Sequence, residues 1–306
     1  VANPLISMLG KPETSHSRLT FAQGFNSLGT TVFPYFGAIL ILGALASQSA
    51  GQLSGAALDA YRTAETQAIV NGYLGLAVAI AVVAGVVWLF RNALPAEQHT
   101  AGGGLAGIDL LTRPRFGFGA LCIFLYVGAE VAIGSLIVGY LMQDSVMGLT
   151  ERAAGDLIFI YWGGALVGRI IGSAVLRFVS PGLVLAGVAA GAIALVLFST
   201  SATGTTAGYS LLAVGLMNSI MFPTIFSLGI HGLGSRAKNA SSFIVMAIMG
   251  GAIMPKLMGH IADSSDMSTG FIVPLACFVF VAFYGLVWSK LSQSEGGVAI
   301  KLNSGH

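Results

Sequence analysis

One carboxylate stands in the middle of an apolar segment. The stretch CIFLYVGAEVAIGSLIVGYLM, residues 122–142, contains Glu130 as its only charged residue. In a helix, Tyr126 lies one turn before Glu130 and Gly134 one turn after it, on the same face. A carboxylate there can accept hydrogen bonds from hydroxyl groups of a ligand. The alternative is a structural contact, a buried hydrogen bond or an ion pair with Arg169 of a neighbouring helix.

Side-chain amides form a second group of candidates. Gln23 and Asn26, in FAQGFNSLG, are one helical turn apart and face the same way. An amide has two donors and an acceptor, which suits hydroxyl groups that both donate and accept. Asn218 and Phe222, also one turn apart, offer an amide and an aromatic face. In the structural alternative the amides only hold helices together and Phe222 packs against the core or lipid.

The composition shows what must position these groups. Of the 306 residues, 55% are hydrophobic and only 8% are charged, and the mean hydropathy is +0.85. Soluble domains carry about a quarter charged residues. The 14 Lys and Arg against 12 Asp and Glu are too sparse for nucleic-acid binding. We therefore expect an all-α integral membrane protein in contact with the lipid bilayer.

The hydrophobic runs predict the spans. A bilayer core about 30 Å thick needs roughly 20 apolar residues per helix. Eight runs qualify, at 20–46, 68–91, 116–142, 155–178, 181–200, 206–230, 240–262 and 270–290, and residues 1–9 are the end of another span. With residues 10–19 in the cytoplasm, ten basic residues lie inside, and only Arg62 and Arg152 lie outside.

Several classes of chemistry are excluded. Cys122 and Cys277 lie in apolar runs without CxxC or CxxH neighbours, which indicates buried free thiols. His260 and Asp263 have no third ligand nearby, so we expect no metal. There is no phosphate-binding loop and no GxSxG motif. The sequence therefore predicts neither an enzyme nor a cofactor.

The chain divides into four parts. Residues 1–91 form a partial helix bundle, 92–115 a cytoplasmic linker that contains RNALPAEQHTAGGG, 116–291 a six-helix bundle and 292–306 a cytoplasmic tail. Pro4 matches Pro223 and Pro34 matches Pro255, at offsets of 219 and 221. Such an offset indicates two parallel halves, of which the first keeps two spans and a stub. The sequence thus predicts a fragment that lacks about a hundred residues of the first half.

Three motifs, VANPLISMLGKPETSHSRLTFAQGFNSLGTT, FPTIFSLGI and SSFIVMAIMGGAI, resemble the fucose–proton symporter family of the major facilitator superfamily. The bacterial glucose/galactose transporters are the most similar branch. The resemblance implies a major facilitator fold of twelve helices in the inner membrane. It also implies alternating access and uptake of a monosaccharide driven by a cation gradient, usually of protons. We expect a monomer.

The resemblance also assigns residues. The sugar-contacting amides of the family fall on Gln23 and Asn26. The first helix of each half lines the central cavity, which implies that Glu130 and Tyr126 face it and that Glu130 accepts from a sugar hydroxyl. The proton-carrying carboxylates of the family lie in its first helix and just before the ANP of its fourth. Both positions precede Val1, so no residue here inherits that role.

Asn218 and Phe222 complete the predicted substrate site, as an amide and as a surface for a sugar ring. Four further residues have predicted structural or gating roles: Pro34, Arg169, Arg177 and Pro255. Arg169 lies past the midpoint of its span, where a charge is normally paired and turned inward. Arg177, in RFVSPG, resembles the cytoplasmic-loop motif of the superfamily. The two prolines predict bends in matching helices.

Two alternatives to import remain: a transporter-like sugar sensor, and a facilitator or exporter of another small polar solute. Among glucose, galactose, fucose, N-acetylglucosamine and fructose, the sequence does not select a sugar, because the geometry of one hydroxyl decides between them.

Overall fold

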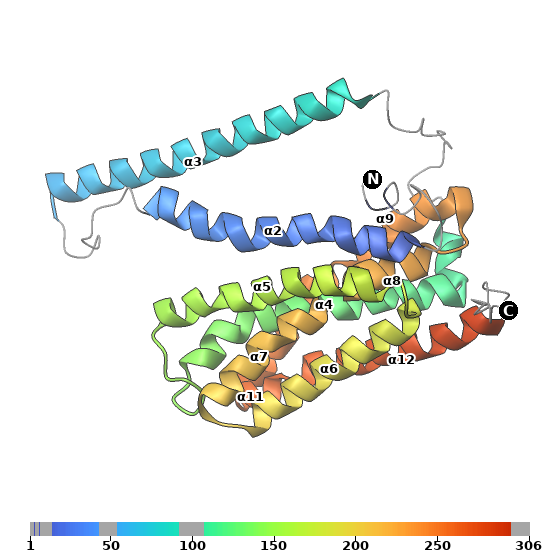
Figure 1. Ribbon diagram of the computed structural model, residues 1–306. Helices are drawn as coiled ribbons and strands as arrows, with labels where there is room; N and C mark the ends of the chain where they lie inside the picture. The colour runs from blue at the N-terminus through green and yellow to red at the C-terminus, as the bar shows by residue number, and fades with distance from the viewer. Residues whose placement is uncertain (1–2, 4–5, 7–13, 43–53, 92–106, 295–306) are drawn as a thin grey trace, which may run out of the picture. The chain divides into compact units, whose positions relative to one another are not determined.

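The computed structural model describes Asn3, Ile6 and residues 14–42, 54–91 and 107–294. Within these ranges every regular element is a helix, as Figure 1 shows. The chain divides into two compact units, Val1–Leu28 with Leu105–His306 and Gly29–Gly104. The predicted all-α fold is confirmed, and the predicted domain bounds stay predictions.

The first two helices differ from the predicted runs at their ends. Helix α2 (Ser15–Leu42) begins five residues before the run at 20–46. Helix α3 (Ala56–Leu89) begins well before the run at 68–91. Its first residues, ALDAYRTAETQA, are mostly good helix formers, and Asp59 lies in the first turn. The helix therefore continues beyond the apolar stretch, to about 50 Å at 1.5 Å per residue.

The later helices follow the six predicted runs between 116 and 290. Three spans begin this part: α4 (Pro114–Met142), α5 (Glu151–Val175) and α6 (Pro181–Ser201). Three further spans consist of helix pairs: α7 (Gly204–Asn218) with α8 (Met221–Ile230), α9 (Ala237–Ala247) with α10 (Gly250–Ser264), and α11 (Met267–Gly270) with α12 (Ile272–Ser294). With α3, seven spans in the described part are long and apolar enough to cross a membrane.

The pairing of helices is a correction, because the sequence predicted continuous spans. The run at 206–230 is interrupted at Ser219–Ile220, and the run at 240–262 at Ile248–Met249. Pro223 explains the first break: it has no N–H to bond the carbonyl of Ser219 four residues before it, and it lies in the first turn of α8, where proline is tolerated.

The second break does not lie at the proline that the sequence singled out. Pro255 is inside α10, and the chain is helical on both sides of it. The interruption comes nearly two turns earlier, where Gly251 N–H bonds the Ile248 carbonyl at 2.9 Å in a tighter turn. Pro34 lies within α2, which continues to Leu42. The predicted bends at both prolines stay predictions.

Close helix contacts depend on glycine. Helix α4 packs against α10 and α12, α6 against α7 and α12, and α5 against α7. Figure 1 shows α6 alongside α12. A Cβ atom on Gly250 would overlap the carbonyl oxygen of Phe124, and one on Gly215 would overlap that of Tyr161. Only glycine allows the backbones to come so near. These two glycines therefore serve helix packing.

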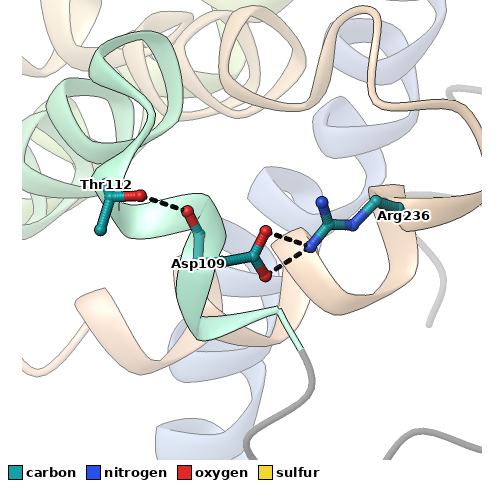
Figure 2. A network of polar contacts seen from close by, with 3 residues as sticks. All are labelled: Asp109, Thr112 and Arg236. Atoms are coloured by element: carbon teal, nitrogen blue, oxygen red, sulfur yellow. Dashed lines mark hydrogen bonds and ion pairs between the residues drawn. The ribbon is translucent and has the colours of Figure 1, made fainter.

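A polar contact joins two of the connecting segments. Figure 2 shows Asp109, in the short helix η4 (Ile108–Thr112), beside Arg236, which ends η5 (Gly234–Arg236). One guanidinium nitrogen, Nη2, lies 2.5 and 2.7 Å from the two carboxylate oxygens. The Thr112 hydroxyl donates to the Asp109 carbonyl at 2.7 Å. The hydrogen bond from Arg236 holds the pKa of Asp109 below its usual value.

The two cysteines behave as the sequence predicted. Cys122 on α4 and Cys277 on α12 are both free and buried. The described residues also contain no group of three or more His, Cys, Asp and Glu side chains that could hold a metal ion.

Candidate functional site

Asn218 is the centre of a buried polar cluster at the break between α7 and α8. Its carbonyl accepts a hydrogen bond from the Tyr126 hydroxyl at 2.9 Å. Its Nδ2 donates to the hydroxyl of Tyr161 on α5, also at 2.9 Å. All three residues are at most 1% exposed. The remaining polar atom, Oδ1 of Asn218, has no partner among the described residues. The cluster therefore offers one buried acceptor to a ligand or a water molecule.

Glu130 borders this cluster from α4. It is half-buried, one turn after Tyr126. The hydroxyl of Tyr161 lies 3.5 Å from the Glu130 carbonyl oxygen, which is the long limit of a hydrogen bond. The Glu130 side chain interacts electrostatically with Tyr126 and Arg169. The structure thus brings together Tyr126, Glu130 and Asn218, as predicted for one site.

Arg169 is buried, as predicted, but neutral acceptors bind it. Its Nε donates to the carbonyl of Ser219 at 2.9 Å, the carbonyl that the break leaves without a helical partner. Its Nη1 donates to the carbonyl of Gln23 at 2.8 Å and to the hydroxyl of Ser27. No salt bridge joins Arg169 to a carboxylate within the described ranges. Arg169 therefore fastens α2 and the α7–α8 break to α5.

The two predicted amides of α2 have different surroundings. Gln23 is half-buried, and its Nε2 donates to Oδ1 of Asn3 at 2.9 Å. Its backbone carbonyl is the one that Arg169 binds. Asn26 is exposed and has no hydrogen bond to the cluster. The geometry therefore links Gln23 to the cluster through Arg169 and leaves Asn26 apart from it.

Phe222 is half-buried at the start of α8. Its ring stacks on that of Phe226, with centroids 6.1 Å apart and an interplanar angle of 23°. One face of the Phe222 ring is therefore covered by Phe226. Its predicted role as a platform for a sugar ring stays a prediction.

Three residues near the cluster were not identified from the sequence. Tyr161 binds Asn218, and Trp162 packs edge-on against Tyr161 with centroids 5.1 Å apart. Trp162 also reaches the space beside Gly134, 3.8 Å from where a Cβ would lie. Asn3 binds Gln23. For Tyr161 and Trp162 the available signal was an aromatic pair in a small-residue stretch, YWGG, and for Asn3 an amide in a hydrophobic stub.

The predicted gating residues lie away from the cluster. Arg177, just past the end of α5, is exposed and donates from Nε to the hydroxyl of Ser17 at 3.3 Å. Ser17 in turn donates to the carbonyl of Ser173 at 2.7 Å. Pro255 is half-buried, and the side chain of Pro34 lies outside the described structure. The gating roles stay predictions.

An apolar cavity lies elsewhere. It measures about 180 Å³, lies between the start of α4 and the end of α12, and is lined by Phe118, Phe280 and Tyr284 among others. None of the predicted substrate residues borders it. The chemistry available at the polar cluster is one carboxylate, an unpartnered amide oxygen and two phenols. That set can recognise a polar molecule by hydrogen bonding.

Relatives share the sequence over nearly its whole length. No protein-family model matches the chain. The chain is 44% identical over 289 residues to a glucose/galactose transporter of Brucella abortus, with 94% of this chain and 67% of that protein covered. It is 32% identical over 302 residues to an L-fucose-proton symporter of Escherichia coli, with 96% and 69% covered.

The fold matches a solved transporter. The crystal structure of FucP in the outward conformation superimposes with a TM-score of 0.84 at 31% identity, covering 94% of this chain and 71% of that chain. The fold and the buried polar cluster define a multi-pass inner-membrane protein of the major facilitator superfamily. Within it, the chain belongs to the family of the bacterial glucose/galactose transporters and the L-fucose-proton symporter. Its relatives are transporters, so the prediction that it is no enzyme is confirmed.

Proposed function

We propose that the protein is a secondary active transporter that imports a hexose-type sugar by alternating access, together with a cation, in the simplest case a proton. The observation that carries the proposal is the acceptor pair at the α7–α8 break, Oδ1 of Asn218 and the carboxylate of Glu130. The names of the relatives support a sugar: glucose and galactose for one, L-fucose with a proton for the other.

The unpartnered acceptor of the cluster favours a solute that carries hydroxyl groups. A buried acceptor without a partner costs about 1–3 kcal/mol. A sugar hydroxyl that donates to Oδ1 of Asn218 removes that cost, and a second hydroxyl can donate to Glu130. Tyr126 and Arg169 then serve to hold the broken backbone in place. Gln23 adds an amide from α2, and no proton carrier is assigned.

The test is counterflow of labelled glucose, galactose and fucose in vesicles that contain the purified full-length protein. We expect counterflow with at least one hexose, and at least a tenfold loss of sugar affinity in Glu130→Gln with the fold intact. The matched control is Glu151→Gln, which changes an exposed carboxylate at the start of α5. Unchanged affinity and counterflow in a folded Glu130→Gln variant would contradict the site.

The same vesicles separate the alternatives. Alkalinisation of the outer medium when sugar is added indicates proton symport, and counterflow without it indicates a facilitator. Sugar binding without counterflow indicates a sensor. The absence of both binding and counterflow for all hexoses would reject the sugar proposal.

A further inference from the structure

A second polar contact joins α2 to α8, at the ends of these helices that the charge distribution places inside. Nδ1 of His16 lies against the hydroxyl of Ser227. The Ser227 hydroxyl donates its own hydrogen to the Pro223 carbonyl at 2.7 Å. With that hydrogen used, the Ser227 oxygen can accept from His16 when the ring carries a hydrogen on Nδ1.

Two hydroxyls lie between this contact and the central cluster. Thr20 follows His16 by one turn of α2, and Thr224 precedes Ser227 by one turn of α8. Both side chains are 0% exposed, and neither hydroxyl has a partner among the described residues. Buried hydroxyls normally find a partner, so each unpartnered one calls for an explanation.

The position of these hydroxyls along the helices supplies the explanation. Thr224 lies in α8, beyond the break that follows Asn218, and three residues before Ser227, which is about 4.5 Å along the axis of α8. On α2, Thr20 lies between Gln23 and His16 in the same way. Polar groups therefore continue from the central cluster to the His16–Ser227 contact, along two helices that meet there.

We propose that the contact between His16 and Ser227 is the inner latch of the transport path, and that its opening presents the hydroxyls of Thr20 and Thr224 to the departing solute. This inference rests on the proposed transport function and adds residues to it. While the latch is closed, the two hydroxyls lack partners. Once it opens, they can bond water or the hydroxyls of the solute, which offsets the loss of the latch contact.

Acidic pH opens this latch. Burial of the ring and, to a smaller extent, the nearby His231 together lower the pKa of His16 to about 4. Two further basic residues lie near in the chain or through Ser17: Arg18 follows Ser17 on α2, and Arg177 donates to the Ser17 hydroxyl. In an open, solvated state the pKa of histidine is about 6.5. The closed state is therefore fully favoured above about pH 6.5 and is weakened as the pH falls toward 4.

The expected size follows from these two pKa values. At pH 5.5 the open state gains about tenfold over its population at pH 7.5. The direction is opposite to that of an ordinary surface histidine salt bridge, because protonation here opposes burial of the ring. This pH dependence requires only that the His16 ring moves from its buried position into water when the latch opens.

The experiment measures access from the inner side without any sugar. In inverted vesicles that contain the full-length protein, Thr224→Cys is labelled with a membrane-impermeant maleimide. The rate is divided by that of Ser242→Cys, an exposed position on α9, so that the pH dependence of the thiol cancels. Labelling of the protein without an introduced cysteine gives the background, which comes only from the buried Cys122 and Cys277. We expect the ratio to rise about tenfold from pH 7.5 to 5.5.

Variants of His16 decide the outcome. His16→Ala should raise the labelling ratio several-fold at pH 7.5, and His16→Gln should keep closure but remove the pH response. Ser227→Ala repeats the first result if His16→Ala fails to fold, and His260→Gln, at an exposed histidine of α10, should behave as the wild type. Wild-type labelling in both Ala variants, or a persistent pH response in His16→Gln, would overturn the latch. Because the labelling uses no sugar, its result can be interpreted even if the protein turns out to transport no hexose.

Discussion

Two of the three spans that consist of helix pairs, α7–α8 and α9–α10, differ in their surroundings. In Gly204–Ile230, 78% of the most apolar stretch is buried, whereas in Ala237–Ser264 the share is 17%. At the first break the carbonyls of Asn218 and Ser219 accept hydrogen bonds from Tyr126 and Arg169. Just after the second break, Gly250 packs so near the backbone carbonyl of Phe124 that a Cβ atom on it would overlap the carbonyl oxygen.

The difference teaches how a broken helix is stabilised where water is scarce. A carbonyl freed inside a membrane needs a new donor, because lipid offers none. At Ser219–Ile220 the donors are side chains of α4 and α5, and the break becomes part of a polar site. At Ile248–Met249 the chain tightens its own turn, and the break serves helix packing. The predictions below separate these two kinds of break.

The largest effect is expected at Arg169. Arg169→Gln removes the donors for the carbonyls of Ser219 and Gln23, and hydrogen bonds to a charged group contribute about 1.5–3 kcal/mol each. We expect a loss of about 3 kcal/mol of stability or more, measured as a lower unfolding midpoint of the purified protein. The unfolding midpoint of Arg169→Lys should lie between those of the wild type and Arg169→Gln. Arg177→Gln should lower the midpoint much less. A midpoint near wild type for Arg169→Gln would show that the break does not depend on the guanidinium.

The second effect tests the packing break. Gly250→Ala places a Cβ on the Phe124 carbonyl oxygen and must separate α10 from α4. Overpacking of this kind costs about 1–3 kcal/mol. Gly259→Ala is the matched control, since a Cβ at this position on the same helix meets nothing within 4 Å. Equal unfolding midpoints for the two variants would contradict a tight α4–α10 contact.

A smaller effect is expected at Tyr126. Tyr126→Phe keeps the ring but removes the donor to the Asn218 carbonyl, which costs about 1 kcal/mol. Sugar affinity should fall as well, if Asn218 binds the solute as proposed. Tyr209→Phe, at a tyrosine of α7 that is 51% exposed, should change neither quantity. A drop in affinity with unchanged stability would indicate that Tyr126 itself touches the sugar.

The smallest effect is expected at the loop ion pair of Figure 2. Asp109 and Arg236 have side chains 58% and 37% exposed. Water and salt screen such a pair, so Asp109→Asn should leave the unfolding midpoint at neutral pH unresolved from wild type. Because the pKa of Asp109 is lowered, its contribution is present above its usual pKa and disappears as the pH falls through the lowered value. A clear destabilisation at pH 7 would show that the loops anchor the helices.

Much of the fold could be predicted from the sequence. The runs of apolar residues are long enough that only helices can satisfy the backbone in lipid, so span positions follow from hydropathy alone. Glu130 was identifiable for the same reason, as a lone acid among apolar neighbours. Tyr161 was not, because an aromatic residue in a membrane helix is ordinary until its partner Asn218 is located.

The breaks were missed for a related reason. A hydropathy profile does not show that Pro223 lacks an N–H group. A proline also does not determine where a helix breaks, because the helix continues through Pro255.

By itself, the amino-acid sequence determined the helical membrane class, the approximate positions of the spans between 116 and 290 and, through its motifs, the family, because these depend on local hydropathy and on residue identity. Only the tertiary structure decided that Arg169 binds backbone carbonyls, that Oδ1 of Asn218 is left without a donor among the described residues, and that His16 meets Ser227. These contacts join residues 50 to 211 positions apart in the chain. Local sequence carries no information on such distances, since packing between helices sets them.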